Sequence, residues 1–261
     1  MPSADAIAAE LVTPGTLTTC MAMLGAPAAS LDQDGQPYGY NPAFATEFAS
    51  RLNLQPVIQQ QTFGELISKV QGHSCDISVS SQNITSDRSA QLNLIPYTQA
   101  KLGFPVVVAI NNPDNIQTLA DLCGKDVSTA LGSTFIDQVN GTGDYASSGL
   151  NAACANAEAK PINLHTYPAE LDAVQALLDN SVAAYLGNSN FVSQYPDLIQ
   201  TSPATLPGNR QGVGVALDHP NLTTAVNASL SEMITDGTYL KILGQYVPAQ
   251  YLDSISIIEA P

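Results

Sequence analysis

Residues 76–88 read Asp-Ile-Ser-Val-Ser-Ser-Gln-Asn-Ile-Thr-Ser-Asp-Arg. Their first half predicts a buried strand, and small polar residues then lead into a turn that ends at Arg88. Because the chain has only eight Lys and Arg against 23 Asp and Glu, a cation beside hydroxyls and amides at a strand end is a candidate anion clamp. The alternative is an exposed arginine that caps a helix or pairs with Asp87, the more common environment for this residue.

Around this stretch, strands alternate with helices. The pattern predicts strands at 16–21, 56–58 and 75–79 and helices at 41–54 and 62–70. It then repeats, with strands at 104–110, 125–130, 162–165, 182–186 and 211–217 and helices at 118–122, from 135, 169–178 and 221–243. Such alternation indicates an α/β protein of two similar units, each with a mostly parallel sheet.

Two polar segments end strands of this pattern. They are Ser80 to Arg88 in the first unit, and Gly132 to Thr134 with Asn188 in the second. Ligands of open α/β sheets bind outside the carboxyl ends of the strands, so we expect these segments to contact a ligand.

Composition excludes several classes of function. A net charge of −15, with no cluster of Lys and Arg, argues against nucleic-acid binding and against docking on anionic lipid. The sequence contains no stretch of about 18 apolar residues, the length that a helix needs to span a bilayer. The segment from Met1 to Asp5 lacks the pattern of a signal peptide, so we interpret that peptide or a lipid anchor as absent, removed or replaced by an initiator Met.

The four cysteines are isolated from one another in the sequence. Cys20, Cys75, Cys123 and Cys154 allow three pairings, of which proximity along the chain favours Cys20–Cys75 and Cys123–Cys154. Disulfides would place the mature protein outside the cytoplasm, whereas the alternative is four reduced, buried thiols in a cytosolic protein. With no C-x-x-C pair and three histidines, the spacing predicts no metal site, and we expect no cofactor.

Six segments, in order, resemble the extracytoplasmic solute-binding proteins of amino-acid ABC transporters, known as family 3. They are 34–40, 75–77 with 84–88, 96–97, 122–127, 132–134 and 236–242. The most specific is Cys75-Asp76-Ile77 followed by Thr85-Ser86-Asp87-Arg88, which resembles the family's Asp-hydrophobic and Thr-x-x-Arg motif. The cysteine placement resembles actinobacterial members, with one bridge in each lobe.

The resemblance implies a two-lobed periplasmic-binding-protein fold of type II that closes around its ligand. By analogy, lobe 1 comprises residues 1–103 with 204–261 and lobe 2 comprises residues 104–203. It also implies an extracytoplasmic protein that takes a small carboxylated solute, an amino acid or a similar molecule, and delivers it to an ABC transporter permease.

The resemblance also assigns ligand-binding roles. Arg88 corresponds to the arginine that forks onto the ligand's α-carboxylate, a geometry that suits a guanidinium. Ser81 and Asn83, just before it, are expected to add hydrogen bonds. Ser133 and Thr134 correspond to the turn at a helix start that donates to the same carboxylate.

Two positions depart from the family pattern. Members that bind α-amino acids usually have a carboxylate where this chain has Asn188, which brings no charge to an α-ammonium. If the alignment is shifted, Glu170, Asp172 or Asp179 supplies that charge. The family's stacking aromatic is missing from the loop 21–28, where Leu24 is instead the expected ligand contact in a more apolar pocket.

Two other functions compete with solute delivery. An enzyme resembling cyclohexadienyl dehydratases needs an ionisable group in the cleft, and Asn188 at the relevant position counts against it. We therefore expect no catalytic residues, and no Gly-x-Ser-x-Gly elbow, P-loop or His-Cys pairing suggests another enzyme class. A ligand-sensing domain without transport is not distinguished from a transport protein by its sequence.

Overall fold

The computed structural model describes residues 1–258 and separates into two compact units. Unit 1 contains Met1–Gln61, Glu65–Lys101 and the chain from Asn209 onward, and unit 2 contains Thr62–Gly64 and Leu102–Gly208. The main exchanges between units lie at Lys101/Leu102 and Gly208/Asn209, where the sequence suggested 103/104 and 203/204.

Unit 1 is built on a five-stranded sheet in the order β4-β1-β5-β12-β6. The strands are β1 (Thr16–Met21), β4 (Gln55–Gln60), β5 (Ile77–Asn83), β6 (Leu92–Gln99) and β12 (Arg210–Ala216). β1 pairs in parallel with β4 and with β5, whereas β12 pairs antiparallel with both β5 and β6. Every residue of β5 is buried, as expected for a central strand covered on both faces.

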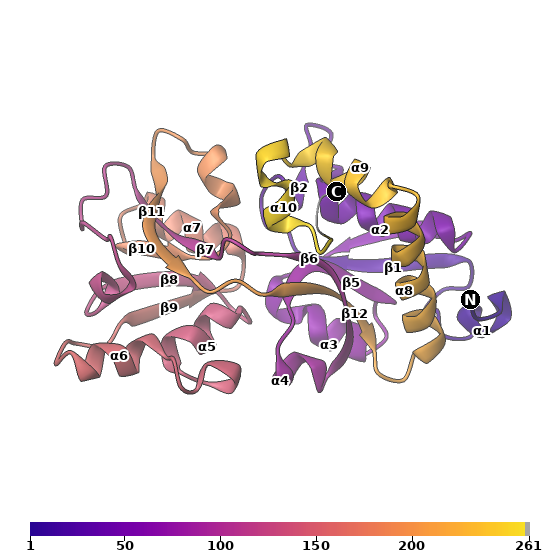
Figure 1. The fold of residues 1–261 in the computed structure, drawn as a ribbon, viewed down its shortest axis with the longest axis horizontal. Coiled ribbons are helices and arrows are strands. Elements are labelled where there is room, and N and C mark those ends of the chain that lie inside the picture. The colour runs from indigo at the N-terminus through magenta and orange to yellow at the C-terminus, as the bar shows by residue number, and fades with distance from the viewer. Residues whose placement is uncertain (259–261) are drawn as a thin grey trace. The chain divides into compact units, whose positions relative to one another are not determined.

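Helices cover both faces of this sheet (Figure 1). One face packs against α2 (Tyr40–Arg51), α8 (Pro220–Thr235) and α9 (Thr238–Tyr246), and the other against α3 (Leu66–Gln71). The remaining short elements are α1 (Ala4–Ala8), β2 (Ser30–Leu31), β3 (Pro37–Tyr38), η1 (Phe63–Glu65), α4 (Ser86–Ser89), η5 (Ala249–Tyr251) and α10 (Leu252–Ile255). The single helix expected at 221–243 is thus two helices, because Gly237 adopts a left-handed φ of 83° that ends the first.

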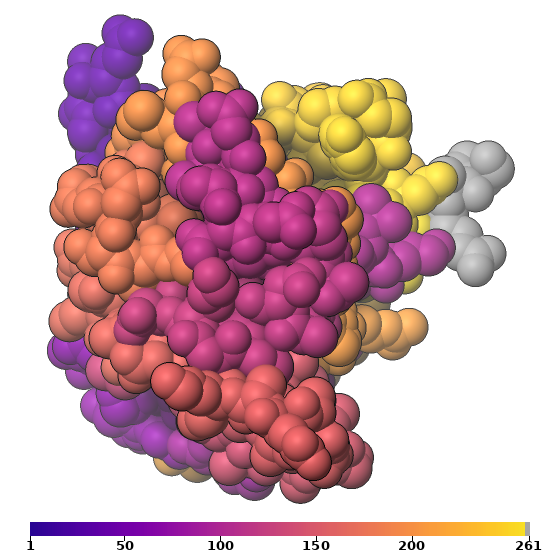
Figure 2. Space-filling model, turned by 90° about the vertical axis from the view of Figure 1, so that its left-hand side faces the viewer, coloured from indigo at the N-terminus to yellow at the C-terminus, as the bar shows by residue number. Residues whose placement is uncertain are grey.

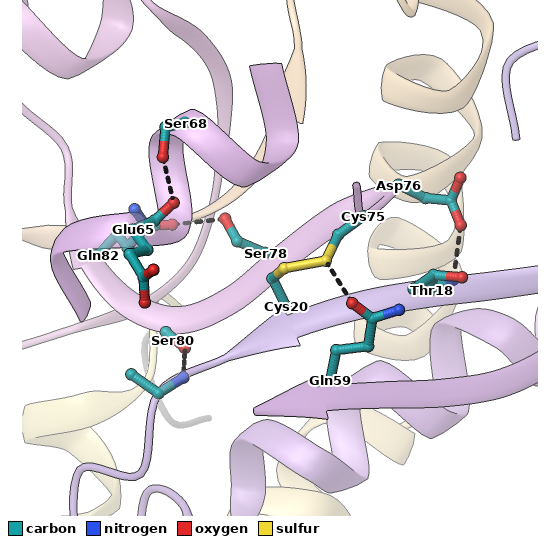
Figure 3. The surroundings of a disulfide bond; sticks show 11 residues. Thr18, Cys20, Gln59, Glu65, Ser68, Cys75, Asp76, Ser78, Ser80 and Gln82 are labelled. Carbon is teal, nitrogen blue, oxygen red and sulfur yellow. Dashed lines mark hydrogen bonds between the residues drawn. A yellow bond between two sulfur atoms is a disulfide. The ribbon is translucent and has the colours of Figure 1, made fainter. Parts of the chain in front are cut away.

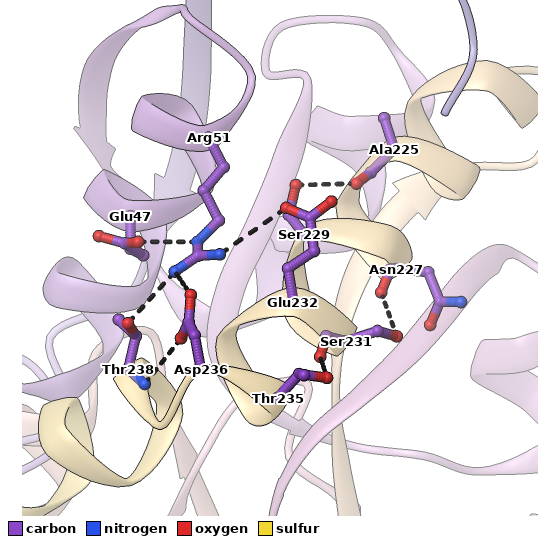
Figure 4. A network of polar contacts seen from close by, with 10 residues as sticks. All are labelled: Glu47, Arg51, Ala225, Asn227, Ser229, Ser231, Glu232, Thr235, Asp236 and Thr238. Atoms are coloured by element: carbon purple, nitrogen blue, oxygen red, sulfur yellow. Dashed lines mark hydrogen bonds and ion pairs between the residues drawn. The ribbon is translucent and has the colours of Figure 1, made fainter.

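Arg51 joins α2 to the junction between α8 and α9 (Figure 4). Its Nε lies 2.8 Å from Glu47 Oε1, and its Nη2 lies 2.7 Å from Asp236 Oδ2. The backbone N–H of Thr238 and the Arg51 guanidinium together lower the pKa of Asp236 to about 2. Three helices are therefore linked by one cation at the surface of unit 1.

Unit 2 repeats the sheet of unit 1 with the order β11-β7-β10-β8-β9. The strands are β7 (Phe104–Ala109), β8 (Asp126–Ala130), β9 (Asn163–Tyr167), β10 (Ala184–Leu186) and β11 (Ile199–Leu206). β8 pairs in parallel with β9 and β10, and β7 pairs antiparallel with β10 and β11. Both sheets therefore have the same topology, and parallel pairing is confined to three strands of each mixed sheet.

Helices also cover both faces of the second sheet (Figure 1). α7 (Glu170–Leu178) packs on one face, and α5 (Thr134–Asn140) and α6 (Leu150–Asn156) lie on the other. Short 3₁₀ turns are η2 (Leu119–Leu122), η3 (Gly143–Tyr145) and η4 (Ser189–Ser193). Residues 110–125, magenta at the centre of Figure 2, run over the surface and are anchored by the buried side chains of Ile116 and Leu122.

Each unit contains one disulfide. Cys20–Cys75 links β1 to the residue that leads into β5, and Cys123–Cys154 links the end of η2 to α6. These are the pairs that chain proximity favours. Among residues 1–258, no helix is long and apolar enough to cross a bilayer.

Candidate functional site

The end of β5 places a buried arginine in unit 1. Thr85 caps the short helix α4 because its Oγ1 accepts a 3.3 Å hydrogen bond from the Arg88 backbone N–H. The Arg88 side chain is 6% exposed, and its Nη1 donates to the main-chain oxygen of Asn83 at 2.9 Å. The alternative of an exposed Arg88 is therefore wrong, although the residue does lie in a helical turn.

Ser81 is held in the left-handed region with a φ of 48°. Its backbone N–H donates to the Tyr97 hydroxyl at 2.8 Å, and its Oγ lies 3.3 Å from both the Tyr40 hydroxyl and Asn41 Nδ2. Burial raises the pKa of Tyr40 to about 12 and also raises that of Tyr97, so both phenols keep their protons. The Ser81 hydroxyl thus has protein partners at the polar end of β5, and its expected contact with the ligand stays a prediction.

A second set of contacts ties the loop after β1 to β5 (Figure 3). Ser80 Oγ accepts from the backbone N–H of Ala22 at 2.8 Å, which holds the loop, and within β5 Ser78 donates to Gln82 Oε1 at 2.5 Å. The Asp76 carboxylate accepts from Thr18 N at 2.6 Å beside the Cys20–Cys75 disulfide. Leu24, expected to contact the ligand, is only 1% exposed in unit 1.

In unit 2, the turn after β8 places Ser133 at the N-terminal cap of α5. The Ser133 hydroxyl lies 2.9 Å from Thr129 Oγ1, which donates to the backbone oxygen of Leu186 at 2.7 Å. Ser133 and Thr134 are both buried. The carboxyl ends of β8 and β10 therefore meet through Thr129, and the expected residues of the second unit lie at one edge of its sheet.

Gln138 is a residue that sequence reasoning missed. It lies one helical turn after Thr134 on α5, is buried, and neither atom of its side-chain amide has a hydrogen-bond partner within residues 1–258. A buried amide without partners costs free energy, so its presence calls for an explanation, and a ligand that it contacts is one. Its spacing of four residues from Thr134 was the available signal, since both side chains lie on one helix face.

Glu170 is buried at the start of α7, close to the tip of β10. Its Oε1 accepts a short hydrogen bond from the Tyr185 hydroxyl and a long one, 3.5 Å, from the Asn188 backbone N–H. Burial raises the pKa of Glu170, and burial together with the Glu170 charge raises the pKa of Tyr185. Residue 187 must be a glycine, because a Cβ added there would lie 1.8 Å from the Tyr185 hydroxyl oxygen.

The two units therefore present related arrangements. β10 occupies the central place in the sheet of unit 2 that β5 occupies in unit 1. Arg88 follows β5, and Asn188, whose backbone N–H donates to Glu170, follows β10. Of the acidic residues considered as substitutes for a charge at position 188, the structure brings Glu170 against Asn188. Asp172, two residues along α7, is exposed.

Comparison with known proteins places the chain in a family. The family model described as bacterial extracellular solute-binding proteins, family 3, matches residues 17–249. The lysine/arginine/ornithine-binding periplasmic protein of Escherichia coli (strain K12) is 30% identical over 245 residues, which cover 91% of this chain and 87% of that protein. The chain belongs to the family 3 solute-binding proteins.

Solved structures with this fold include an ancestral arginine-binding protein bound to arginine, which is 25% identical with a TM-score of 0.76 over 89% of this chain and 98% of that one. Another is the ancestral amino acid-binding protein AncCDT-1, a precursor of cyclohexadienyl dehydratase. It is 22% identical with a TM-score of 0.70 over 89% of this chain and 95% of that one, and this likeness shows the fold alone.

Proposed function

We propose that this solute-binding protein captures a small solute with a carboxylate, an amino acid or a close analogue, and delivers it to an ABC transporter permease outside the cytoplasm. The observation that carries the ligand class is the buried guanidinium of Arg88 at the end of β5. Relatives that bind lysine, arginine and ornithine are consistent with a ligand that carries an α-carboxylate.

Arg88 has the chemistry that a carboxylate clamp needs. A guanidinium presents several N–H donors in a rigid fork that matches the two oxygens of a carboxylate. The Asn83 main-chain oxygen accepts from the Arg88 guanidinium, and the Thr85 hydroxyl accepts from the Arg88 backbone N–H, so the residues at the end of β5 orient this arginine. Loss of one partner from a buried charged pair costs about 2–5 kcal/mol, which corresponds to at least a 30-fold loss of affinity.

A ligand screen with matched arginine variants tests this clamp. Thermal denaturation of the untagged protein is measured with the common amino acids, ornithine, betaines, opines and dicarboxylates, and hits are confirmed by calorimetry. A ligand present at 100 times its Kd adds about 2.7 kcal/mol to the free energy of unfolding. We expect Arg88→Ala to abolish the melting shift, while Arg210→Ala, which removes an exposed arginine of the same unit, preserves it.

Two results would refute the clamp. One is a wild-type melting shift in Arg88→Ala with the confirmed ligand. The other is equal affinity for the ligand and for its carboxamide, which lacks the negative charge. Circular dichroism of the variant without ligand shows whether it is folded, so a loss of binding is not mistaken for unfolding.

We also propose that Glu170 supplies the negative charge that Asn188 lacks. The Asn188 N–H contacts the Glu170 carboxylate, so a ligand ammonium near the amide oxygen of Asn188 would also feel that charge across a short, weakly screened distance. Glu170→Gln keeps the shape and removes the charge, with Asp172→Asn as the matched control on the exposed side of α7.

The expected result is selective for the ammonium. Glu170→Gln should weaken binding of the α-amino acid at least tenfold and change binding of the corresponding 2-hydroxy acid less than threefold. Equal losses for both ligands would mean that Glu170 only supports the fold of β10. No loss for either ligand would mean that the charge comes from elsewhere.

A substitution of Gln138 distinguishes a ligand-binding role of this residue from a structural one. If its amide contacts the ligand, Gln138→Leu lowers affinity but raises the stability of the ligand-free protein, because replacing an unsatisfied buried amide by an apolar group is favourable. Unchanged affinity in a more stable variant would assign Gln138 to the core.

Binding without catalysis is the better supported of the two activities on this fold. A dehydratase would need a general acid, and the buried Glu170, with its raised pKa, is the group in unit 2 that could serve. Its carboxylate is instead engaged by the Tyr185 hydroxyl and the Asn188 backbone. Incubation with prephenate or arogenate, followed spectroscopically, should leave both substrates intact, and their consumption by the wild type but not by Glu170→Gln would reverse this proposal.

A further inference from the structure

Two turns that are distant in sequence meet on the surface of unit 1 and bring together two of the three histidines. His73 lies between α3 and β5, and Asp218 and His219 lie between β12 and α8. The nitrogen and oxygen atoms that these three side chains offer all lie within 4.8 Å of one another. His73 Nε2 is 3.4 Å from Asp218 Oδ2, and the two imidazole rings stack with their centroids 4.6 Å apart.

We propose that His73, Asp218 and His219 bind a divalent transition-metal ion of the zinc class. Two imidazoles and one carboxylate form a donor set that suits zinc, with water in the fourth position. Donor atoms about 2.0–2.2 Å from a tetrahedral zinc are about 3.3 Å apart, so the present arrangement needs a contraction of about 1.5 Å at most. The exposed side chains of His73 and Asp218 can supply it by rotamer changes.

The backbone that carries the three residues is well anchored. His73 N donates to Val70 O at 3.1 Å, and Cys75, two residues later, is fixed by its disulfide to β1. His219 N donates to Ala216 O at 3.1 Å, and Val70 and Ala216 pack in one buried apolar cluster. Both turns therefore rest on the same part of the core, which lowers the entropic cost of bringing the ligands together.

His219 provides an independent indication of a bound ion. Its Nδ1 is shielded from solvent and has no hydrogen-bond partner among the described residues. The ring also interacts electrostatically with the Asp76 carboxylate, which immediately precedes β5. A ring nitrogen without a protein partner is available for coordination, and a nearby carboxylate favours a cation.

Zinc titration of the untagged, EDTA-treated protein tests the site, and the third histidine offers a matched control. We expect calorimetry with zinc chloride to give one ion per chain. His73→Ala and Asp218→Asn, both at exposed positions, should weaken binding at least tenfold. His165→Ala should bind as the wild type does, since His165 pairs with Asp126 in unit 2 and lies outside the cluster.

A direct readout keeps the test independent of variant folding. In a ¹⁵N-histidine spectrum of the wild type, zinc should shift the ring signals of His73 and His219 and leave those of His165 unchanged. The site would be overturned by no binding at millimolar zinc, by several weak ions unaffected by His73→Ala, by an equal loss in His165→Ala, or by half an ion per chain, which would indicate a site shared between two copies.

Discussion

Replacement of Tyr97 by phenylalanine probes how the polar end of β5 is held in place. The Tyr97 side chain is fully buried between Phe44 and the end of β5, and its hydroxyl joins two backbone segments. It accepts from the Ser81 backbone N–H at 2.8 Å and donates to Asn41 Oδ1 at 2.6 Å. Phenylalanine keeps the ring and its packing, so the change removes these two hydrogen bonds and the longer contact, 3.4 Å, between the hydroxyl and Ser81 Oγ.

The magnitude follows from the groups left without partners. A buried polar group that loses its hydrogen bond costs about 1–3 kcal/mol. The Ser81 N–H loses the Tyr97 hydroxyl as its acceptor, whereas Asn41 Oδ1 keeps a 3.5 Å contact with Ser81 Oγ, so the cost at Asn41 lies at the lower end of this range. We therefore expect Tyr97→Phe to lower the free energy of unfolding by about 2–3 kcal/mol. The same change should weaken ligand binding, because Ser81 loses a contact that holds its left-handed conformation two residues before Asn83.

Urea denaturation followed by far-ultraviolet circular dichroism measures this loss, since the chain has no tryptophan. The transition of unit 1 should move to lower urea with an unchanged slope. Tyr251→Phe, which alters an exposed tyrosine of the same unit, should change stability by less than 0.5 kcal/mol. A loss below about 1 kcal/mol in Tyr97→Phe would show that the hydroxyl does not hold β5, and the reasoning on Ser81 would fail with it.

Three further changes test other parts of the fold. The disulfides Cys20–Cys75 and Cys123–Cys154 close loops with sequence separations of 55 and 31, so their loss should lower the free energy of unfolding by about 4.2 and about 3.7 kcal/mol by the chain-entropy relation. Urea denaturation of the two double-serine variants measures this, and a loss under about 1 kcal/mol for either contradicts it. Gly187→Ala forces a methyl group against Tyr185 and should destabilise unit 2 by about 1–3 kcal/mol; an unchanged melting temperature would exclude the clash. Because the folded-state pKa of Asp236 lies near 2, below its ordinary value of 3.8, its contribution is present above pH 3.8 and is lost as pH falls towards 2. Asp236→Asn should therefore flatten the fall in urea midpoint over that range, and identical pH profiles would refute it.

One edge strand of each five-stranded sheet was missed by the sequence analysis. β6 and β11 were not predicted, although each spans eight residues. Pro96 and Pro203 interrupt their apolar pattern, and both strands have register shifts at or near these prolines. Edge strands tolerate proline and bulges because they need fewer ladder hydrogen bonds, so the usual strand signal is weak there.

The candidate site was predictable in part. Asn83 ends a strand and Arg88, Ser133 and Thr134 follow strands whose hydrophobic runs are clear, so their place near strand ends could be predicted from the sequence. Their roles as ligand contacts stay predictions. Gln138 was not identified, and Glu170 was only one of three candidates for the charge missing at Asn188, because burial and side-chain contacts are properties of packing that no local pattern reports.

Sequence by itself determined the two-unit α/β architecture and the family, because periodicity and ordered motifs are local features of the chain. It favoured the cysteine pairs that the structure contains without deciding them. Tertiary structure alone decided which side chains share a neighbourhood. It buries Arg88 and places Ser81 within hydrogen-bond distance of Tyr40 and Tyr97. It also brings Glu170 into contact with the Asn188 backbone and stacks His73 on His219, which is distant in sequence. These contacts join residues from separate strands and helices, and only the packing of a complete sheet with its helices brings such residues within hydrogen-bond distance.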